Sequence, residues 1–174
     1  EVAVEDVKAD FPQPKFEGNT TKEKLINLLK SDNVASQQGM VEMFDSHVGA
    51  STVLMPYGGK YQLTEEEASV QKVPVLGKES NTASIMTFGY NPFISEWSPF
   101  HGAAYAVVES ISKVVAVGGK WQGIRFSFQE YFERLGNNTE TWGKPFSALL
   151  GTLFVQKGFG LPAIGGKDSM SGTF

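Results

Sequence analysis

A glycine-rich stretch near the end of the chain carries the residue types with the clearest chemistry. It contains Gly165 and Gly166, followed by Lys167, Asp168 and Ser169. Glycines let a backbone approach a ligand closely and turn its N–H groups toward an anion. A lysine adds positive charge for a phosphate, and an aspartate can hold Mg²⁺. These residues favour phosphate binding, but the spacing is not that of a P-loop, and a simple turn without a ligand is the alternative.

Glu109 and Lys113 form a second candidate site, four residues apart in an apolar helical pattern. That spacing puts both side chains on one face of a helix, where an ion pair contributes about 0.2–0.5 kcal/mol. A carboxylate in this position can also bind a metal ion. The ion pair is the plainer interpretation, and metal binding by Glu109 is the sharper one.

The two histidines and one aromatic, charged segment complete the candidates. His101 stands where a helix begins and could hydrogen bond there, although a partly buried loop histidine is the plainer interpretation. His47 has Asp45 and Ser46 beside it, but neighbours in sequence do not make a catalytic triad. Residues 129–134 could line a cleft at a sheet edge. We favour an exposed helical turn with its aromatic side chains packed inward.

Composition excludes several classes of protein. The chain has 174 residues, of which 41% are hydrophobic and 20% charged, so it can bury a core. It has no cysteine, which excludes a disulfide scaffold, a cysteine-ligated metal site and a cysteine nucleophile. The net charge of −4 lacks the basic footprint of a nucleic-acid binder. No run approaches the roughly 18 apolar residues of a membrane span. We therefore expect neither nucleic acid nor membrane as a partner.

Local patterns place the candidates on helices and strands. Thr20 and Glu23 have the spacing of a capping box, and an apolar stripe follows them, so a helix is expected to begin there. Periodicity predicts the longest helix over 102–117 and another over 145–157. Also expected are a short helix within 34–45, a solvated loop or helix start over 64–67, a loop over 89–99, and strands over 51–55, 83–88, 124–128 and 161–164, the last feeding the glycine-rich loop.

The alternation of strands and helices predicts an α/β (α+β) layer fold, with helices on one face of a mixed sheet. Residues 1–19 are expected to be a linker and 20–72 a small helical and strand segment. Residues 73–174 are expected to form the main domain, truncated at its C-terminus. The chain starts without a methionine and stops just beyond the glycine-rich stretch, whose flanking strands need partners. We therefore expect it to be a piece of a larger protein.

Several stretches, taken together and in order, resemble phosphoribosylformylglycinamidine synthase of the large, single-chain type. The resemblance covers about residues 20–174. No single block is specific, but the combination is. The blocks are Asn33–Asp45, Val53–Gly59, Trp97–Ser110, Ile124–Phe132 and Leu161–Gly172.

The resemblance implies a fold, an activity and partners. The family is a cytoplasmic ligase of purine biosynthesis that converts formylglycinamide ribonucleotide, glutamine and ATP to formylglycinamidine ribonucleotide, with Mg²⁺ accompanying the nucleotide. Its synthase core has two related halves, each with a domain like the N-terminal domain of aminoimidazole ribonucleotide synthetase. A separate glutaminase domain releases the ammonia. This chain looks like the linker into the second half and most of that half's first α/β domain, so its partners would be the other half, the glutaminase domain and a small-molecule nucleotide.

Departures from the family pattern imply that this half is not catalytic. The catalytic half resembles Gly-Ala-Ala-Thr-Gly-Val-Gly-Gly where this chain has the helix-compatible residues 102–109. The family's second half can hold an auxiliary, structural nucleotide with metal ions, and Glu109 matches a glutamate used there. Lys113, however, replaces an asparagine ligand, and Gly77 or Lys78 falls near an expected aspartate. The resemblance thus implies Glu109 as the one candidate metal ligand, with no catalytic residue in this piece.

We hypothesise that phosphate or nucleotide binds at Gly165, Gly166, Lys167, Asp168, Ser169 and Lys113. ATP or ADP with Mg²⁺ is expected for the full-length enzyme, and this piece alone is expected to be inactive. An autonomous scaffold or interaction module without catalysis is the alternative. In either case an unpaired sheet edge favours self-association of the isolated chain.

Overall fold

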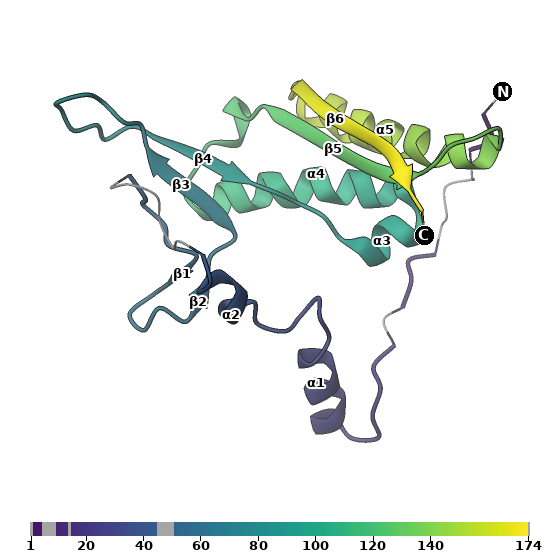
Figure 1. Cartoon of the computed structure of the whole chain (residues 1–174), viewed down its shortest axis with the longest axis horizontal. Helices are drawn as coiled ribbons and strands as arrows, with labels where there is room; N and C mark the ends of the chain where they lie inside the picture. Colours follow the sequence, from purple (N-terminus) through teal and green to yellow (C-terminus); the bar gives the residue numbers. More distant parts are fainter. Residues whose placement is uncertain (1, 5–9, 14, 45–50, 174) are drawn as a thin grey trace. The chain divides into compact units, whose positions relative to one another are not determined.

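The computed structural model describes residues 2–4, 10–13, 15–44 and 51–173. They form two compact units, which are taken separately here. One comprises Phe11–Ser84, and the other comprises Glu1–Asp10 together with Ile85–Phe174. The expected α/β class is confirmed, since helices and short sheets alternate along the chain (Figure 1). The boundaries expected at 19/20 and 72/73 stay predictions.

The Phe11–Ser84 unit begins with helix α1 (Thr21–Leu29), whose start confirms the expected capping box. The Thr20 hydroxyl accepts a hydrogen bond from the Glu23 amide at 3.2 Å, and the Glu23 carboxylate accepts one from the Thr20 amide at 3.0 Å. Each bond satisfies an amide that has no partner within the helix. Two residues therefore fix where α1 begins.

Several expectations for the same unit need correction. The helix expected within 34–45 shrinks to α2 (Gln38–Val41), and residue 45 lies outside the described residues, as does His47. The strand expected over 51–55 is only an isolated bridge between Thr52 and Gln71. The stretch 64–67, expected as a loop or helix start, begins with strand β2. Sequence periodicity missed these elements because pairing, and not an apolar stripe, defines strands this short.

The strands of this unit form two-stranded sheets. β1 (Tyr57–Gly58) pairs antiparallel with β2 (Thr64–Glu65). β3 (Ala68–Lys72) pairs with β4 (Ala83–Thr87), whose first two residues belong to this unit. The strand expected over 83–88 is thus confirmed.

The Ile85–Phe174 unit contains the long helices. α3 (Pro92–Trp97) occupies the stretch expected to be a loop. α4 (Pro99–Ala116) begins three residues before the expected start at 102. The Asn91 side chain caps α3 and the Ser98 side chain caps α4, each followed by a proline in the first turn. A cap residue directly before a proline is the signal that could have located both starts.

The rest of this unit contains two strands and a long helix. After the short 3₁₀ turn η1 (Trp121–Gly123) come β5 (Phe126–Glu133), α5 (Thr139–Phe159) and β6 (Ala163–Gly172). β5 runs through the segment for which we favoured an exposed helical turn, so that interpretation was wrong. α5 begins six residues before Pro145, because the Asn138 side chain caps it there.

β5 and β6 lie side by side and parallel, along α5 (Figure 1). Beneath them five buried side chains from both helices, β5 and the α5–β6 connection form the core; they are Val107, Ile111, Phe126, Val155 and Leu161. α4 and α5 cross closely, since a Cβ atom on Gly151 would lie 2.1 Å from the Phe100 carbonyl oxygen. This layer of helices on a parallel strand pair positions the candidate residues.

Candidate functional site

The glycine-rich stretch is not a loop. Residues 163–172 form strand β6, in which Gly165 to Ser169 pair with successive residues of β5. The sequence expectation of a turn was wrong because β5 offers a free parallel edge that no local pattern reveals. Gly166 lies close to its partner strand, since a Cβ atom there would come 2.4 Å from the Phe128 carbonyl oxygen. At that position glycine serves close strand approach.

Strand geometry separates two residues that the sequence places together. Successive side chains of a strand point to opposite faces, so Lys167 and Asp168 cannot share one. Lys167 pairs with Gln129, and Asp168 pairs with Glu130. Lys167 and Ser169 therefore belong to one face of the sheet and Asp168 to the other. A phosphate held by Lys167 and a metal ion held by Asp168 would lie on opposite faces.

Glu130 is the functional candidate that sequence reasoning missed. Its side chain is only 8% exposed, and its Oε2 atom has no hydrogen-bond partner. Burial, with the Asp168 carboxylate beside it, raises the pKa of Glu130 to about 7. The buried Phe126 lies four residues earlier on the same strand face. An acidic residue in phase with buried aromatic residues was the available signal.

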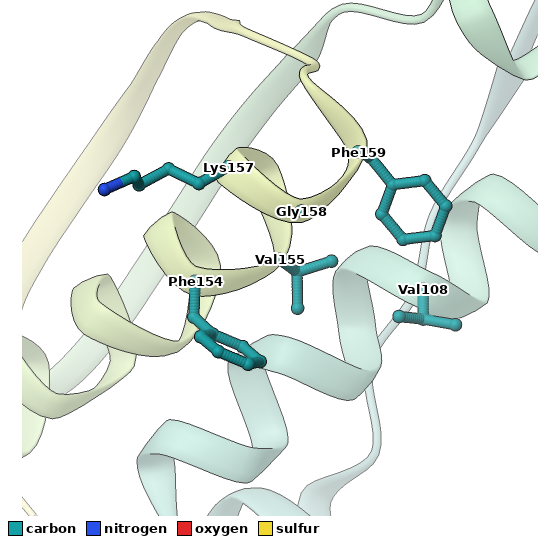
Figure 2. A pocket seen from close by; sticks show the side chains of 6 residues that line it. All are labelled: Val108, Phe154, Val155, Lys157, Gly158 and Phe159. Atoms are coloured by element: carbon teal, nitrogen blue, oxygen red, sulfur yellow. The ribbon is translucent and has the colours of Figure 1, made fainter.

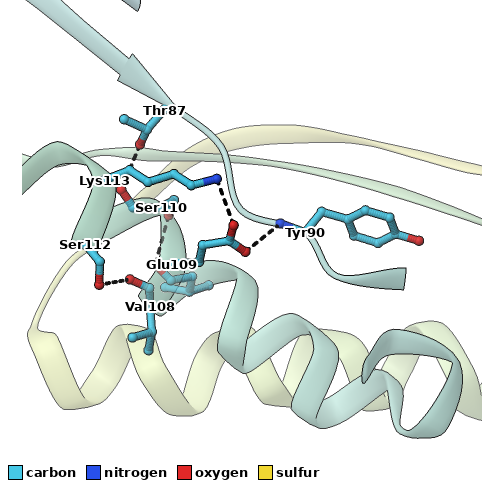
Figure 3. Close-up of polar contacts among 8 residues, drawn as sticks. Thr87, Tyr90, Val108, Glu109, Ser110, Ser112 and Lys113 are labelled. Carbon is cyan, nitrogen blue, oxygen red and sulfur yellow. Dashed lines mark hydrogen bonds and ion pairs between the residues drawn. The ribbon is translucent and has the colours of Figure 1, made fainter. Parts of the chain in front are cut away.

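Glu109 and Lys113 on α4 form the ion pair that their spacing of four residues predicts. The Lys113 ammonium lies 2.7 Å from Oε1 of Glu109, and Oε2 accepts a hydrogen bond of 3.1 Å from the Tyr90 amide (Figure 3). The ammonium also lies 4.5 Å from the centre of the Phe88 ring. Both carboxylate oxygens of Glu109 are therefore engaged. A metal ion at Glu109 would compete with a lysine that already supplies the positive charge.

The other candidates have structural partners. The His101 ring lies in the first turn of α4, where Nδ1 is 2.9 Å from the Ser98 hydroxyl and the Trp97 ring is 4.7 Å away. Within the described part of the chain, no three acidic or histidine side chains gather as metal ligands. The structure thus presents two separate groups, Glu109 with Lys113 on α4 and the β5–β6 pair.

A shallow apolar depression lies between α4 and α5. Val108 and Phe154 line it with the last turns of α5, and the Lys157 ammonium points away from it (Figure 2). Phe154 is 68% exposed. An apolar surface of this kind is typical of a contact face and offers no polar group to orient a small substrate.

Comparison with known proteins identifies relatives that match most of this chain. No family model matches it. The phosphoribosylformylglycinamidine synthase subunit PurL of Pyrobaculum calidifontis is 30% identical over 164 residues, which are 92% of this chain and 21% of that protein. This chain is related to phosphoribosylformylglycinamidine synthase. The subunit PurL of Methanobrevibacter smithii is 28% identical over 118 residues, or 68% of this chain and 14% of that protein.

A solved structure supports the fold. The structure of PurLQS from Thermotoga maritima superposes on all of this chain with a TM-score of 0.62 and 15% identity, and the match covers 24% of that chain. This match supports the fold, and the PurL sequence relatives confirm the family resemblance expected from the sequence. This chain spans about a fifth, or less, of the length of these relatives. The single-chain type of synthase stays a prediction, because the relatives are named as subunits.

No helix in the described part of the chain combines the length and apolar character needed to cross a membrane.

Proposed function

We propose that this chain is a non-catalytic, nucleotide-holding part of a phosphoribosylformylglycinamidine synthase. The full enzyme would be a glutamine-dependent ligase of de novo purine biosynthesis, using ATP with Mg²⁺. The observation that carries the proposal is the alignment with PurL subunits over 92% of the chain. The reaction would phosphorylate the amide oxygen of formylglycinamide ribonucleotide, and ammonia would then displace the phosphate to give formylglycinamidine ribonucleotide.

The absence of catalysis in this part is argued from α4. Where the catalytic half is expected to have flexible glycines, residues 103–109 continue a regular helix, and Val107 is buried in the core. A chain segment locked by core packing cannot rearrange around a reacting phosphate. Lys113 pairs with Glu109 at the expected metal position. This segment therefore holds ligands or structure and performs no chemistry.

Nucleotide binding is proposed at two lysines. Lys167 and Ser169 share one face of β6, where an ammonium and a hydroxyl can both contact a phosphate. Gly165 and Gly166, directly before Lys167, have no side chains that would obstruct a phosphate there. Asp168 lies on the opposite face of β6, so its side chain cannot contact this phosphate directly and supports the site only through the strand backbone. Lys113, on α4, binds phosphate directly in place of a metal ion, and Glu109 is retained as the weaker candidate for a metal ligand.

The partners follow from the same assignment. The proposed protein contains the other synthase half and a glutaminase domain, takes a small-molecule nucleotide, and acts in the cytoplasm without nucleic acid or membrane. Self-association of the isolated chain is proposed because β5 and β6, within the described residues, have only each other as strand partners. The apolar depression between α4 and α5 adds a second surface that favours contact. Sedimentation showing only monomer at high concentration would contradict this.

Calorimetric titration of the chain with ATP and ADP tests the nucleotide site. We expect measurable binding that weakens at least tenfold in Lys167→Ala and is unchanged in Lys157→Ala, a lysine on α5. Glu109→Ala should bind nucleotide as the parent chain does. Mg²⁺-dependent binding lost in Glu109→Ala would overturn the view that this site lacks a metal ion. No heat at millimolar nucleotide would refute nucleotide binding by the isolated chain.

The assignment to the ligase is tested separately by activity. The complete reading frame that encodes this chain should restore growth without purines to a strain lacking the synthase. The 174-residue chain, given formylglycinamide ribonucleotide, ATP and ammonia, should form no product. Product formed by the chain alone would refute the non-catalytic role, and failed complementation would refute the assignment to the ligase.

A further inference from the structure

Glu130 and Asp168 face each other across the two parallel strands of the Ile85–Phe174 unit. They are register partners in β5 and β6. Neighbouring strands are about 4.8 Å apart, and paired residues of parallel strands project from the same face. Two carboxylates from residues 38 positions apart in sequence are thus brought to one spot. Carboxylates on register partners of neighbouring strands can bind the same cation.

The Glu130 side chain is built into this spot. It is 8% exposed, and its Oε2 atom is buried without a hydrogen-bond partner. A buried carboxylate oxygen without a partner costs about 1–3 kcal/mol or more, so such groups are rare in folded proteins. Asp168 is exposed and leaves the spot open to solvent on one side. The pair therefore offers one fixed ligand and one accessible ligand.

The local charge balance calls for a cation. Among the described residues, neither an arginine nor a lysine forms an ion pair with Glu130 or Asp168. From α5, the Lys144 ammonium pairs with Glu133 instead. Lys167 belongs to the opposite face of β6, as its register with Gln129 requires. Two like charges are left beside each other, and burial makes their repulsion stronger.

We propose that Glu130 and Asp168 together bind one divalent metal ion of the Mg²⁺ or Mn²⁺ type. Both ions prefer hard oxygen ligands, and Mg²⁺ is commonly held by one or two carboxylates while water fills its remaining positions. The open Asp168 side admits those waters. The buried Oε2 atom of Glu130, which has no hydrogen-bond partner, supplies one oxygen ligand.

This site does not depend on the proposed nucleotide function. It uses the face of β6 opposite Lys167 and shares no residue with the Glu109–Lys113 pair on α4. It also requires no ATP. A failure of nucleotide binding would leave it untouched, and a failure of metal binding here would leave the nucleotide proposal untouched.

Manganese titration of the 174-residue chain, followed by electron paramagnetic resonance without nucleotide, tests the proposal. We expect one bound Mn²⁺ per chain, displaced by Mg²⁺. Glu130→Gln and Asp168→Asn should each weaken the affinity at least tenfold. Glu96→Gln, which changes an exposed acid on α3 in the same way, should leave it unchanged.

Three results would overturn the proposal. They are no Mn²⁺ binding up to millimolar concentration, unchanged binding in Asp168→Asn, and loss of binding in Glu109→Gln instead. Asp168 is exposed, so its variant should fold even if Glu130→Gln does not. All three tryptophans belong to the Ile85–Phe174 unit, and their fluorescence verifies that each variant has folded there.

Discussion

Replacing Gly151 by alanine should separate α4 from α5. Gly151 is a buried residue within α5, and a Cβ atom on it would lie 2.1 Å from the Phe100 carbonyl oxygen. Real Cβ atoms essentially never come within 3.0 Å of such an atom, so the two helices must move apart by roughly 1 Å. The obstructing atom is backbone in α4, and no side-chain rotation can relieve the clash.

The expected magnitude follows from two opposing effects. Overpacking a core costs about 1–3 kcal/mol, whereas alanine favours a helix over glycine by up to about 1 kcal/mol. A net loss of about 1–2 kcal/mol in the free energy of unfolding is therefore expected. Gly158→Ala provides the matched control, because the same helix has nothing within 4 Å of a Cβ there. This control should be stabilised slightly or unchanged.

Urea unfolding followed by tryptophan fluorescence measures both variants. The signal reports the Ile85–Phe174 unit alone, since Trp97, Trp121 and Trp142 all belong to it. With a urea slope of about 1–3 kcal/mol per M, the Gly151→Ala midpoint should fall by roughly 0.3–2 M. A Gly151→Ala chain as stable as the parent, with Gly158→Ala destabilised, would refute the close crossing of α4 and α5.

Three further outcomes are expected. The raised pKa of Glu130 means that the carboxyl group stays protonated to a higher pH in the native state than in the unfolded state. Without metal, the free energy of unfolding should therefore fall as the pH rises from about 4.5 to 7, by a total on the order of 2 kcal/mol. Urea unfolding across that pH range should show this decrease, and Glu130→Gln should abolish it. Thr20→Ala should weaken the start of α1 by about 1 kcal/mol and speed amide hydrogen exchange at Lys24 about fivefold, and unchanged exchange would argue against the capping box. Lys113→Met should cost no more than about 1 kcal/mol in urea unfolding, because Glu109 is 38% exposed and can be hydrated; a much larger loss would contradict the partly exposed ion pair.

Features with local causes could be predicted from the sequence. The Thr20 and Glu23 capping box depends on residues three apart, and so does the cap that starts each of α3 and α4. The Glu109–Lys113 ion pair depends on helical spacing alone. The cap signals at Asn91 and Ser98 were present in the sequence but lay in a stretch that two prolines made look like a loop. A proline after a cap residue begins a helix as readily as it ends one.

The β5–β6 register could not be predicted in this way. Parallel strands need a crossover, here α5, so the residues that meet are far apart in sequence and no local pattern pairs them. Gly165 and Gly166 are compatible with a phosphate-binding turn, because glycine adopts the backbone angles that such a turn needs. They are equally compatible with a strand that approaches its neighbour closely. The presence of β5 as a partner strand selects the strand conformation. Strand propensity disfavours glycine and aspartate, so here the tertiary pairing with β5 overrides it.

The strand conformation of residues 163–172 changes which side chains can share a binding site. Read as a turn, the Lys167 and Asp168 neighbours suggest one site that holds phosphate and metal together. Read as a strand, they belong to opposite faces, and each acquires a partner from β5 that the sequence could not name. Asp168 gains Glu130, a buried acid whose raised pKa has its cause in burial and in that neighbour. One change in backbone conformation thus converts a single expected anion site into two chemically different faces, one basic and one acidic. Experiments that vary Lys167 and Asp168 separately, with nucleotide and with metal ion, distinguish the two arrangements, because a single turn predicts that both variants lose both ligands.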